Sequence, residues 1–237
     1  MYWVAVETST ATGSVALFDE SKLVAEKSWT REGSHSEFLT DSFNQLLNSE
    51  KIQPSQISRV AVGVGPGSFT GVRVAVNFAR AFSYSVNAQV YAIDSLQLLA
   101  YKYASLAENN RLCVLQFGFR DISYYSHFEV TGDRRLRRVG EICAVTPKEL
   151  ENLMTEPTVV VGSASTRLKS VFSEALRSKL VIKTTERDFP LASDFQHSQV
   201  LTDKTHLTDW IHTIPLYIRD SEAEEKLKRG ELKSAQN

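Results

Sequence analysis

The stretch from residue 59 to residue 71 reads RVAVGVGPGSFTG, an apolar run followed by a turn rich in glycine. The run Arg59–Val64 predicts a buried strand, because it is short, continuous and rich in valine. Gly65-Pro66-Gly67 predicts a tight turn, since glycine accepts a positive φ and proline fixes its own φ. A buried strand that ends in such a turn is typical of an α/β protein.

A helix is expected directly after the turn, from about Val72 to about Val86, with Ser68 or Thr70 as its N-cap. Backbone amides at a helix start favour anions, so a phosphate site is one interpretation. The alternative is a purely structural turn, and it is favoured because the motif lacks the Gly-Lys-Ser/Thr of a P-loop and the spacing of dinucleotide folds. The residues of this expected structural loop are Gly65, Pro66, Gly67, Ser68, Phe69, Thr70 and Gly71.

Apolar periodicity extends the pattern on both sides of the turn. Strands are expected at Tyr2–Val6, Ser14–Phe18, Leu23–Trp29 and Val90–Ile93, with a helix from Ser34 or Ser36 to Leu47 and another, capped by Ser95, to Leu106. The order βββαβαβα is that of a ribonuclease H-like, actin-like lobe. We therefore expect an α/β protein whose first half forms such a lobe.

The second half predicts a smaller lobe. Strands are expected at Leu112–Phe119, Ser123–Val130 and Thr158–Val161, and helices at Pro147–Met154, Val171–Leu176 and Ser193–Leu201. Polar residues at Glu108-Asn109-Asn110 suggest the boundary. The expected division is a first lobe at 1–107, a second lobe at 108–220 and a charged tail at 221–237.

Composition bounds the class of protein. The chain has 237 residues, 27 Lys and Arg against 28 Asp and Glu, and 42% hydrophobic residues. These values argue against a disordered chain and against nucleic-acid binding driven by overall charge. Cys113 and Cys143 are too few for a disulfide framework. With no signal peptide and no apolar run long enough to span a bilayer, we expect a soluble cytoplasmic protein without membrane contact.

The helix after the turn is apolar around most of its circumference. Between Val72 and Ser85 only Arg73 and Arg80 carry charge. A surface helix usually needs a single apolar stripe. Two interpretations remain open: this helix lies deep within the fold, or it buries a second face against a partner.

Catalytic and metal-binding patterns are weak. His35 lacks a histidine partner at i+4, where Leu39 stands, and the other histidines are scattered, so no metal site is expected. Glu7-Thr8-Ser9-Thr10 follows the first strand, where actin-like kinases bind phosphate, yet no Lys or Arg lies in this turn. No Gly-x-Ser-x-Gly elbow is present. We expect no catalytic residues and no cofactor.

Taken together, these motifs resemble the TsaB (YeaZ) family, which is required to make threonylcarbamoyladenosine at position 37 of tRNAs that read codons beginning with A. The resemblance rests on Glu-Thr-Ser after the first strand, Gly-Ser-Val-Ala at 13–16, His35-Ser36-Glu37 and Gly-Pro-Gly-Ser-Phe-Thr-Gly-Val-Arg at 65–73. It is strong over residues 2–105 and weaker beyond. Ser123–Phe128 and Pro215-Leu-Tyr-Ile-Arg219 are similar to the family's second-lobe strand and its ending.

The resemblance implies an α/β, two-lobed actin-like/ribonuclease H-like (ASKHA) fold with a reduced second lobe. It also implies a non-catalytic partner of the catalytic subunit TsaD, in a complex that also recruits the ATPase TsaE. It implies contact with tRNA only through the complex, and a homodimer through the same helices when the chain is alone. The loss of a metal-binding His-x-x-x-His at Leu39 fits this role. The implied interface residues are His35, Phe38, Ser42, Gln45, Arg73, Val74, Ala75, Val76, Asn77, Phe78, Ala79, Arg80 and Tyr84.

Three departures from the family pattern weaken any expectation of nucleotide binding. Glu7 stands where the family usually has Asp, Gly118-Phe119-Arg120 where many members have Asp-Ala-Arg, and Gly162-Ser163-Ala164 where some have Gly-x-Gly. The alternatives are an actin-like ATP-dependent kinase or ATPase, which would use Glu7–Thr10 and Gly162–Ala164 as nucleotide loops, and a metallopeptidase.

Overall fold

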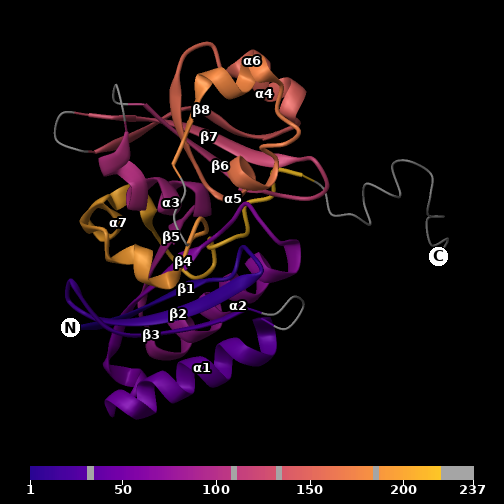
Figure 1. Cartoon of the computed structure of the whole chain (residues 1–237). Coiled ribbons are helices and arrows are strands. Elements are labelled where there is room, and N and C mark those ends of the chain that lie inside the picture. The colour runs from indigo at the N-terminus through magenta and orange to yellow at the C-terminus, as the bar shows by residue number, and fades with distance from the viewer. Residues whose placement is uncertain (31–34, 108–110, 132–134, 184–186, 220–237) are drawn as a thin grey trace.

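The computed structural model describes residues 1–30, 35–107, 111–131, 135–183 and 187–219. It has two lobes stacked along one axis, with the early residues in the lower lobe and the orange second-half residues in the upper lobe (Figure 1). Each lobe contains one sheet with helices against it. The predicted two-lobed α/β fold is confirmed.

The first sheet has the strand order β11-β5-β4-β1-β2-β3. Its strands are β1 Tyr2–Glu7, β2 Thr12–Asp19, β3 Lys22–Thr30, β4 Ile57–Gly63, β5 Gln89–Ile93 and β11 Leu207–Thr208. β1 pairs antiparallel with β2 and parallel with β4, and β4 pairs parallel with β5. The strand predicted from the opening stretch therefore lies at the centre of the sheet.

The alternation of residues in β1 assigns helices to the two faces of the first sheet. Val4 and Val6 pack with α1 (His35–Glu50) and α2 (Phe69–Val86) on one face, whereas Trp3 and Ala5 pack with α3 (Ser95–Tyr103) on the other. Successive side chains of a strand point to opposite faces, and both faces of a central strand are buried. This explains why β1 is apolar at every position between Trp3 and Val6.

The second sheet repeats the topology of the first, with the order β10-β9-β6-β7-β8. Its strands are β6 Arg111–Phe117, β7 Ser123–Val130, β8 Leu136–Val145, β9 Thr158–Val161 and β10 Leu180–Ile182. α4 (Pro147–Leu153), α5 (Ser163–Arg167) and α6 (Glu174–Lys179) cover one face, and α3 packs against the other. In each sheet three antiparallel strands precede two parallel ones, so the two lobes share one strand order apart from the additional β11 of the first sheet.

Several predicted elements differ from the structure. β8, β10, β11 and α5 were not expected, and the predicted helix Val171–Leu176 begins only at Glu174, because Ser173 is its N-cap. The predicted helix Ser193–Leu201 is divided into a 3-10 helix, Ala192–Gln196, and α7, Ser198–Thr202. Three further short 3-10 helices occur among the described residues. Ala104–Leu106 follows α3, Lys204–His206 precedes β11, and Pro54–Gln56 precedes β4.

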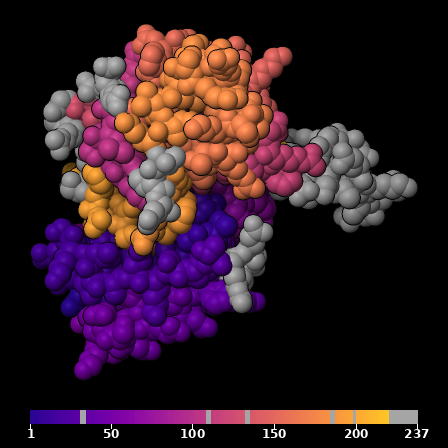
Figure 2. Space-filling view, viewed as in Figure 1, coloured from indigo at the N-terminus to yellow at the C-terminus, as the bar shows by residue number. Residues whose placement is uncertain are grey.

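Residues 187–219, which the sequence places in the second lobe, return to the first. β11 pairs with β5, and Phe195 and Val200 lie in the same apolar cluster as Trp3. Figure 2 shows these late residues between the two lobes. The sequence could not indicate this return, because pairing between distant segments leaves no local pattern. The predicted boundary residues 108–110, the predicted cap Ser34 and the tail 221–237 lie outside the described residues.

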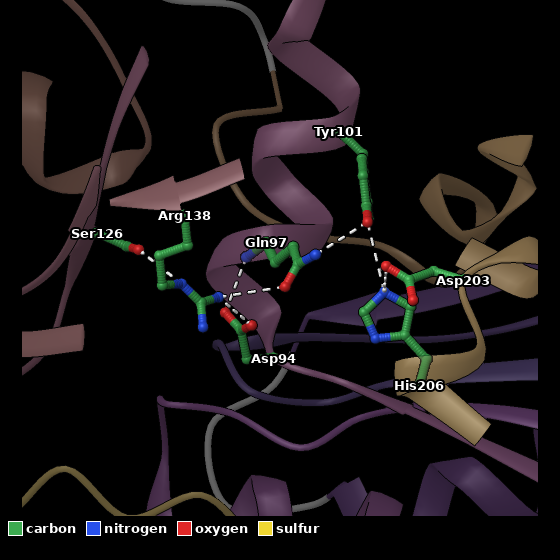
Figure 3. Close-up of polar contacts among 7 residues, drawn as sticks. All are labelled: Asp94, Gln97, Tyr101, Ser126, Arg138, Asp203 and His206. Carbon is green, nitrogen blue, oxygen red and sulfur yellow. Dashed lines mark hydrogen bonds and ion pairs between the residues drawn. The ribbon is translucent and has the colours of Figure 1, made fainter. Parts of the chain in front are cut away.

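Polar contacts join the lobes at the start of α3 (Figure 3). Arg138 of β8 pairs with Asp94, and its Nε donates to Ser126 Oγ at 3.1 Å. Asp94, not the predicted Ser95, is the N-cap of α3, since its carboxylate accepts from Gln97 N at 2.8 Å. The ion pair therefore fixes a second-lobe strand to the N-cap of a first-lobe helix. Asp94 is buried, so removal of Arg138 would leave an unpaired charge.

Asp194 helps to hold the returning segment, residues 187–219, through buried polar contacts. Its carboxylate accepts from Leu191 N at 2.8 Å and lies 3.8 Å from Lys102 Nζ. Burial raises the pKa of Asp194 from 3.8 to about 6, so the folded state favours the protonated form. The stabilisation of the folded state by protonation of Asp194 is fully present below pH 3.8. It is lost as the pH rises through the folded-state pKa of about 6.

Asp194→Asn cannot titrate. Between pH 3.8 and pH 6 we therefore expect the stability of this variant to increase relative to the parent by roughly 2–3 kcal/mol. Urea unfolding of both proteins across this pH range measures the difference. A pH-independent difference would contradict a buried, protonated Asp194.

Candidate functional site

The glycine turn is clamped against the backbone that follows β1. Ser68 N donates to Ser9 O at 2.7 Å, and Thr8 Oγ1 donates to Gly71 O at 2.7 Å. A Cβ at Gly67 would overlap the Ser9 carbonyl oxygen, and one at Gly71 would overlap that of Thr8. Glycine is required at both positions by this close approach.

The turn also sets where α2 begins. Ser68 is the N-cap, and its Oγ accepts from Gly71 N at 3.2 Å. α2 therefore begins at Phe69, three residues before the expected Val72. The structure supports the structural interpretation of the loop, because the amide of Ser68 is already used within the chain.

A cleft of about 770 Å³ lies between the lobes. Residues 9–12 and 67–69 form its first-lobe wall, residues 116–119 with Arg167 form its second-lobe wall, and residues 216–219 also line it. The described lining contains two arginines, Arg167 and Arg219, and no Asp, Glu, His, Cys or Lys. A cleft of this size fits a small molecule, while its described side chains provide no general base near neutral pH.

Glu7 points beneath the cleft rather than into it. Its Oε1 accepts from Ser9 N at 2.6 Å, and its Oε2 accepts from Ser95 Oγ at 2.9 Å. The side chain is fully buried, and burial raises the pKa of its carboxyl group. Gly63 provides the room, because a Cβ there would collide with the carboxylate. Glu7 thus joins β1 to α3 and is not placed to hold a cation in the cleft.

His35 is engaged through both ring nitrogens. Nδ1 accepts from Trp29 Nε1 at 3.1 Å, and Nε2 donates to Thr10 O at 2.9 Å. Burial lowers the pKa of the imidazole, so the neutral ring holds the start of α1 against the β1–β2 hairpin. Within the described segments, no three His, Cys, Asp or Glu side chains come together in a group that could hold a metal ion.

α2 has one buried face and one outward face. Val72, Ala75, Val76 and Ala79 are buried against the chain's own sheet. On the outward side, Tyr84 is 69% exposed. The interpretation that α2 lies deep in the fold therefore holds for one face, and contact of the other face with a partner stays a prediction.

The structure separates the predicted interface residues by exposure. Arg73, Asn77, Tyr84 and Gln45 are exposed, and Phe38, Ser42, Val74, Phe78 and Arg80 are half-buried. His35, Ala75, Val76 and Ala79 are buried in this chain, so their predicted direct contact with a partner is wrong. They belong to the first lobe's own core because they face the sheet. Whether the remaining residues form an interface stays a prediction.

A segment missed as part of this surface lies along α2. Near one end of α2, Trp210 contacts Tyr84 edge to face, with the two ring centres 4.9 Å apart. Near the other end, Tyr217 stacks on Phe69, with the ring centres 4.8 Å apart. Ile211 and Ile214, between these anchors, are 54% and 65% exposed. We call residues 210–217 the C-terminal strap. Its only sequence signal was the ending Pro215-Leu-Tyr-Ile-Arg219.

Two sheets with one repeated strand order and a cleft between them define an actin-like protein. No helix within the described ranges has both the length and the apolar character needed to cross a membrane. The family model described as tRNA N6-adenosine threonylcarbamoyltransferase, TsaD, matches residues 30–227. The chain belongs to this family, in its TsaB (YeaZ) branch.

Similar proteins support this placement. The TsaB protein of Bacillus subtilis (strain 168) is 26% identical over 226 residues, covering 94% of this chain and 96% of that relative. The TsaB protein of Escherichia coli (strain K12) is 28% identical over 98 residues, covering 41% and 42%. YeaZ from Pseudomonas aeruginosa superposes with a TM-score of 0.73 at 20% identity, covering 91% of this chain and 99% of that one, which shows the shared fold.

The two hydrogen bonds of Glu7 should stabilise the folded state. Glu7→Ala removes an acceptor from two buried donors, so we expect it to lower the free energy of unfolding by roughly 2–4 kcal/mol. Glu7→Gln provides a neutral side chain of the same length, and we expect a change within about 1 kcal/mol. Urea unfolding at neutral pH measures both. Equal, large losses in both variants would show that the position requires the charge.

Proposed function

We propose that this chain takes part in the biosynthesis of threonylcarbamoyladenosine in tRNA as a non-catalytic partner of a TsaD-type subunit. The family model and the relatives named as tRNA threonylcarbamoyladenosine biosynthesis proteins support the pathway. The relative from Bacillus subtilis supports it most strongly, because that similarity extends along nearly the whole of both chains. The site of action proposed for this complex is the cytoplasm.

The observation that carries the partner role is the outward face of α2. Val74, Phe78 and Phe82 are half-buried and lie beside the exposed Ala81 and Tyr84. Phe78 and Phe82 stack at 5.8 Å, and both contact Phe43 of α1 edge to face. This face combines apolar side chains on a rigid aromatic cluster with the polar Arg73, Asn77 and Arg80. A partner helix can bury the aromatic part with little loss of side-chain entropy.

The geometry of the cleft supports a non-catalytic role. Glu7 is the carboxylate next to the hairpin where an ATP-dependent actin-like kinase would hold Mg²⁺, and it is bonded to Ser9 and Ser95 instead. His35, which a metallopeptidase would use, has both nitrogens engaged. These bonds support structural roles for Glu7 and His35.

A single surface suffices for the proposed assembly. The outward face of α2 and the exposed side of α1 bind TsaD in the complex, and the same face pairs with a second copy when TsaD is absent. The ATPase TsaE and the tRNA join through the complex. The effect of this subunit on the reaction is then a coupling free energy transmitted through TsaD.

Ala81→Glu provides the test. The new carboxylate would lie at the centre of the exposed α2 face, where burial of an unpaired charge costs several kcal/mol. We expect loss of co-elution with a TsaD-type subunit on size-exclusion chromatography and at least a tenfold weaker Kd by calorimetry. The fold should be unchanged, because Ala81 is exposed.

Ala175→Glu is the matched control. Ala175 is also an exposed alanine on a helix, in α6 of the second lobe. We expect this variant to bind TsaD like the parent. Unchanged binding by Ala81→Glu, or equal losses in both variants, would contradict an interface on α2.

A further inference from the structure

The C-terminal strap is anchored to α2 at both of its ends. At one end, Tyr217 stacks on Phe69, and its Oη accepts from Arg73 Nε at 2.7 Å. At the other end, the ring of Trp210 lies against that of Tyr84. Arg73 and Tyr84 both belong to the predicted partner interface, so the strap is continuous with that interface at each end.

Contacts between the two ends fix the course of the strap. Thr213 is buried, and its N and Oγ1 both donate to Asp209 O, at 3.1 Å and 2.6 Å. Leu216 N donates to Val64 O at 2.8 Å, and the Leu216 side chain packs against the first-lobe core. A segment held in this way has little conformational freedom left to lose when a partner binds.

The strap exposes large apolar side chains from this rigid backbone. Ile211 and Ile214 are exposed although Thr213 between them is buried, and Tyr217 is exposed as well. Residues 213–218 carry no charge. Single exposed apolar residues are ordinary on protein surfaces, whereas several gathered on one strip mark a contact with another molecule. The strap therefore has the character of a docking surface.

The position and chemistry of the strap favour a protein as its occupant. Residues 210–217 include no Lys or Arg, so the strap offers no charge to the phosphates of a tRNA. Tyr84 belongs to the outward face of α2 and also contacts Trp210. A protein that covers the outward face of α2 therefore reaches the strap without a gap.

We propose that the C-terminal strap is a second docking strip for the TsaD-type subunit, with Ile211 and Ile214 packing against an apolar patch of that subunit. This inference rests on the proposed function, since it takes its occupant from the interface proposed on α2. The strap gives the partner a second row of apolar contacts, on chain that lies far from α2 in the sequence.

The test replaces both exposed isoleucines. Ile211→Ser combined with Ile214→Ser removes the apolar strip and leaves the anchors Trp210 and Tyr217 in place. We expect calorimetry to give a Kd for the TsaD-type subunit at least tenfold weaker than that of the parent. The Tm should stay within about 2 °C of the parent, because both side chains are exposed.

Leu153→Ser combined with Val171→Ser is the matched control. Both residues are exposed and apolar but belong to the second lobe, so we expect the parent Kd. Equal losses in the control and in the strap variant would overturn the proposal. Parent-like binding by the strap variant would also overturn it. The proposed function would survive that result if Ala81→Glu still weakened binding, and would fail with it if Ala81→Glu bound like the parent.

Photocrosslinking identifies the occupant directly. With p-benzoylphenylalanine in place of Ile214, irradiation of the mixture should link the strap to the TsaD-type subunit. The same group in place of the exposed Val171 should give no such link. A link formed only between two copies of this chain would make a second copy the occupant and overturn the proposal.

Discussion

The structure depends on one close backbone approach, in which the glycine turn after β4 meets the residues that follow β1. Gly67 and Gly71 have no Cβ, so Ser68 N can reach Ser9 O and Thr8 Oγ1 can reach Gly71 O. This contact sets the first residue of α2 and holds the hairpin that forms one wall of the cleft. The start of α2 and one wall of the cleft are therefore both positioned by the same turn.

The cleft between the two lobes has no Asp or Glu among its described lining residues. Each lobe buries both faces of its sheet, and the lobes meet through α3, the Arg138–Asp94 ion pair and the returning segment 187–219. Where actin-like ATPases need an acid facing the cleft, Glu7 turns under the hairpin into the space left by Gly63. The Glu7 side chain thus has a structural role, because its hydrogen bonds connect β1 to α3 inside the first lobe.

Much of the first lobe could be predicted from sequence, because its strands and helices carry strong local patterns. The continuous apolar run at 59–64 indicated a buried strand, and Ser68 was one of the two residues expected to cap α2. β8 was missed because an edge strand can carry charges such as Arg137 and Arg138, which hide its alternation. β11 was missed because two residues that pair with a distant strand have no period to detect.

The candidate site was harder to predict than the fold. The apolar circumference of α2 indicated two buried faces, but sequence alone could not show that Ala75, Val76 and Ala79 belong to the inward one. The direction of the Glu7 side chain depends on Gly63 in another strand, and the exposure of Ile211 and Ile214 depends on how the strap crosses α2. Each of these properties is decided by tertiary contacts.

The central claim is that the outward side of α1 and α2 meets a TsaD-type subunit. Hydrogen–deuterium exchange of the full chain, measured with and without that subunit, tests it most directly. We expect slower exchange upon binding in peptides from residues 35–48 and 73–86, and unchanged exchange in residues 147–182 of the second lobe. Protection confined to the second lobe, with α1 and α2 exchanging as in the free chain, would contradict it.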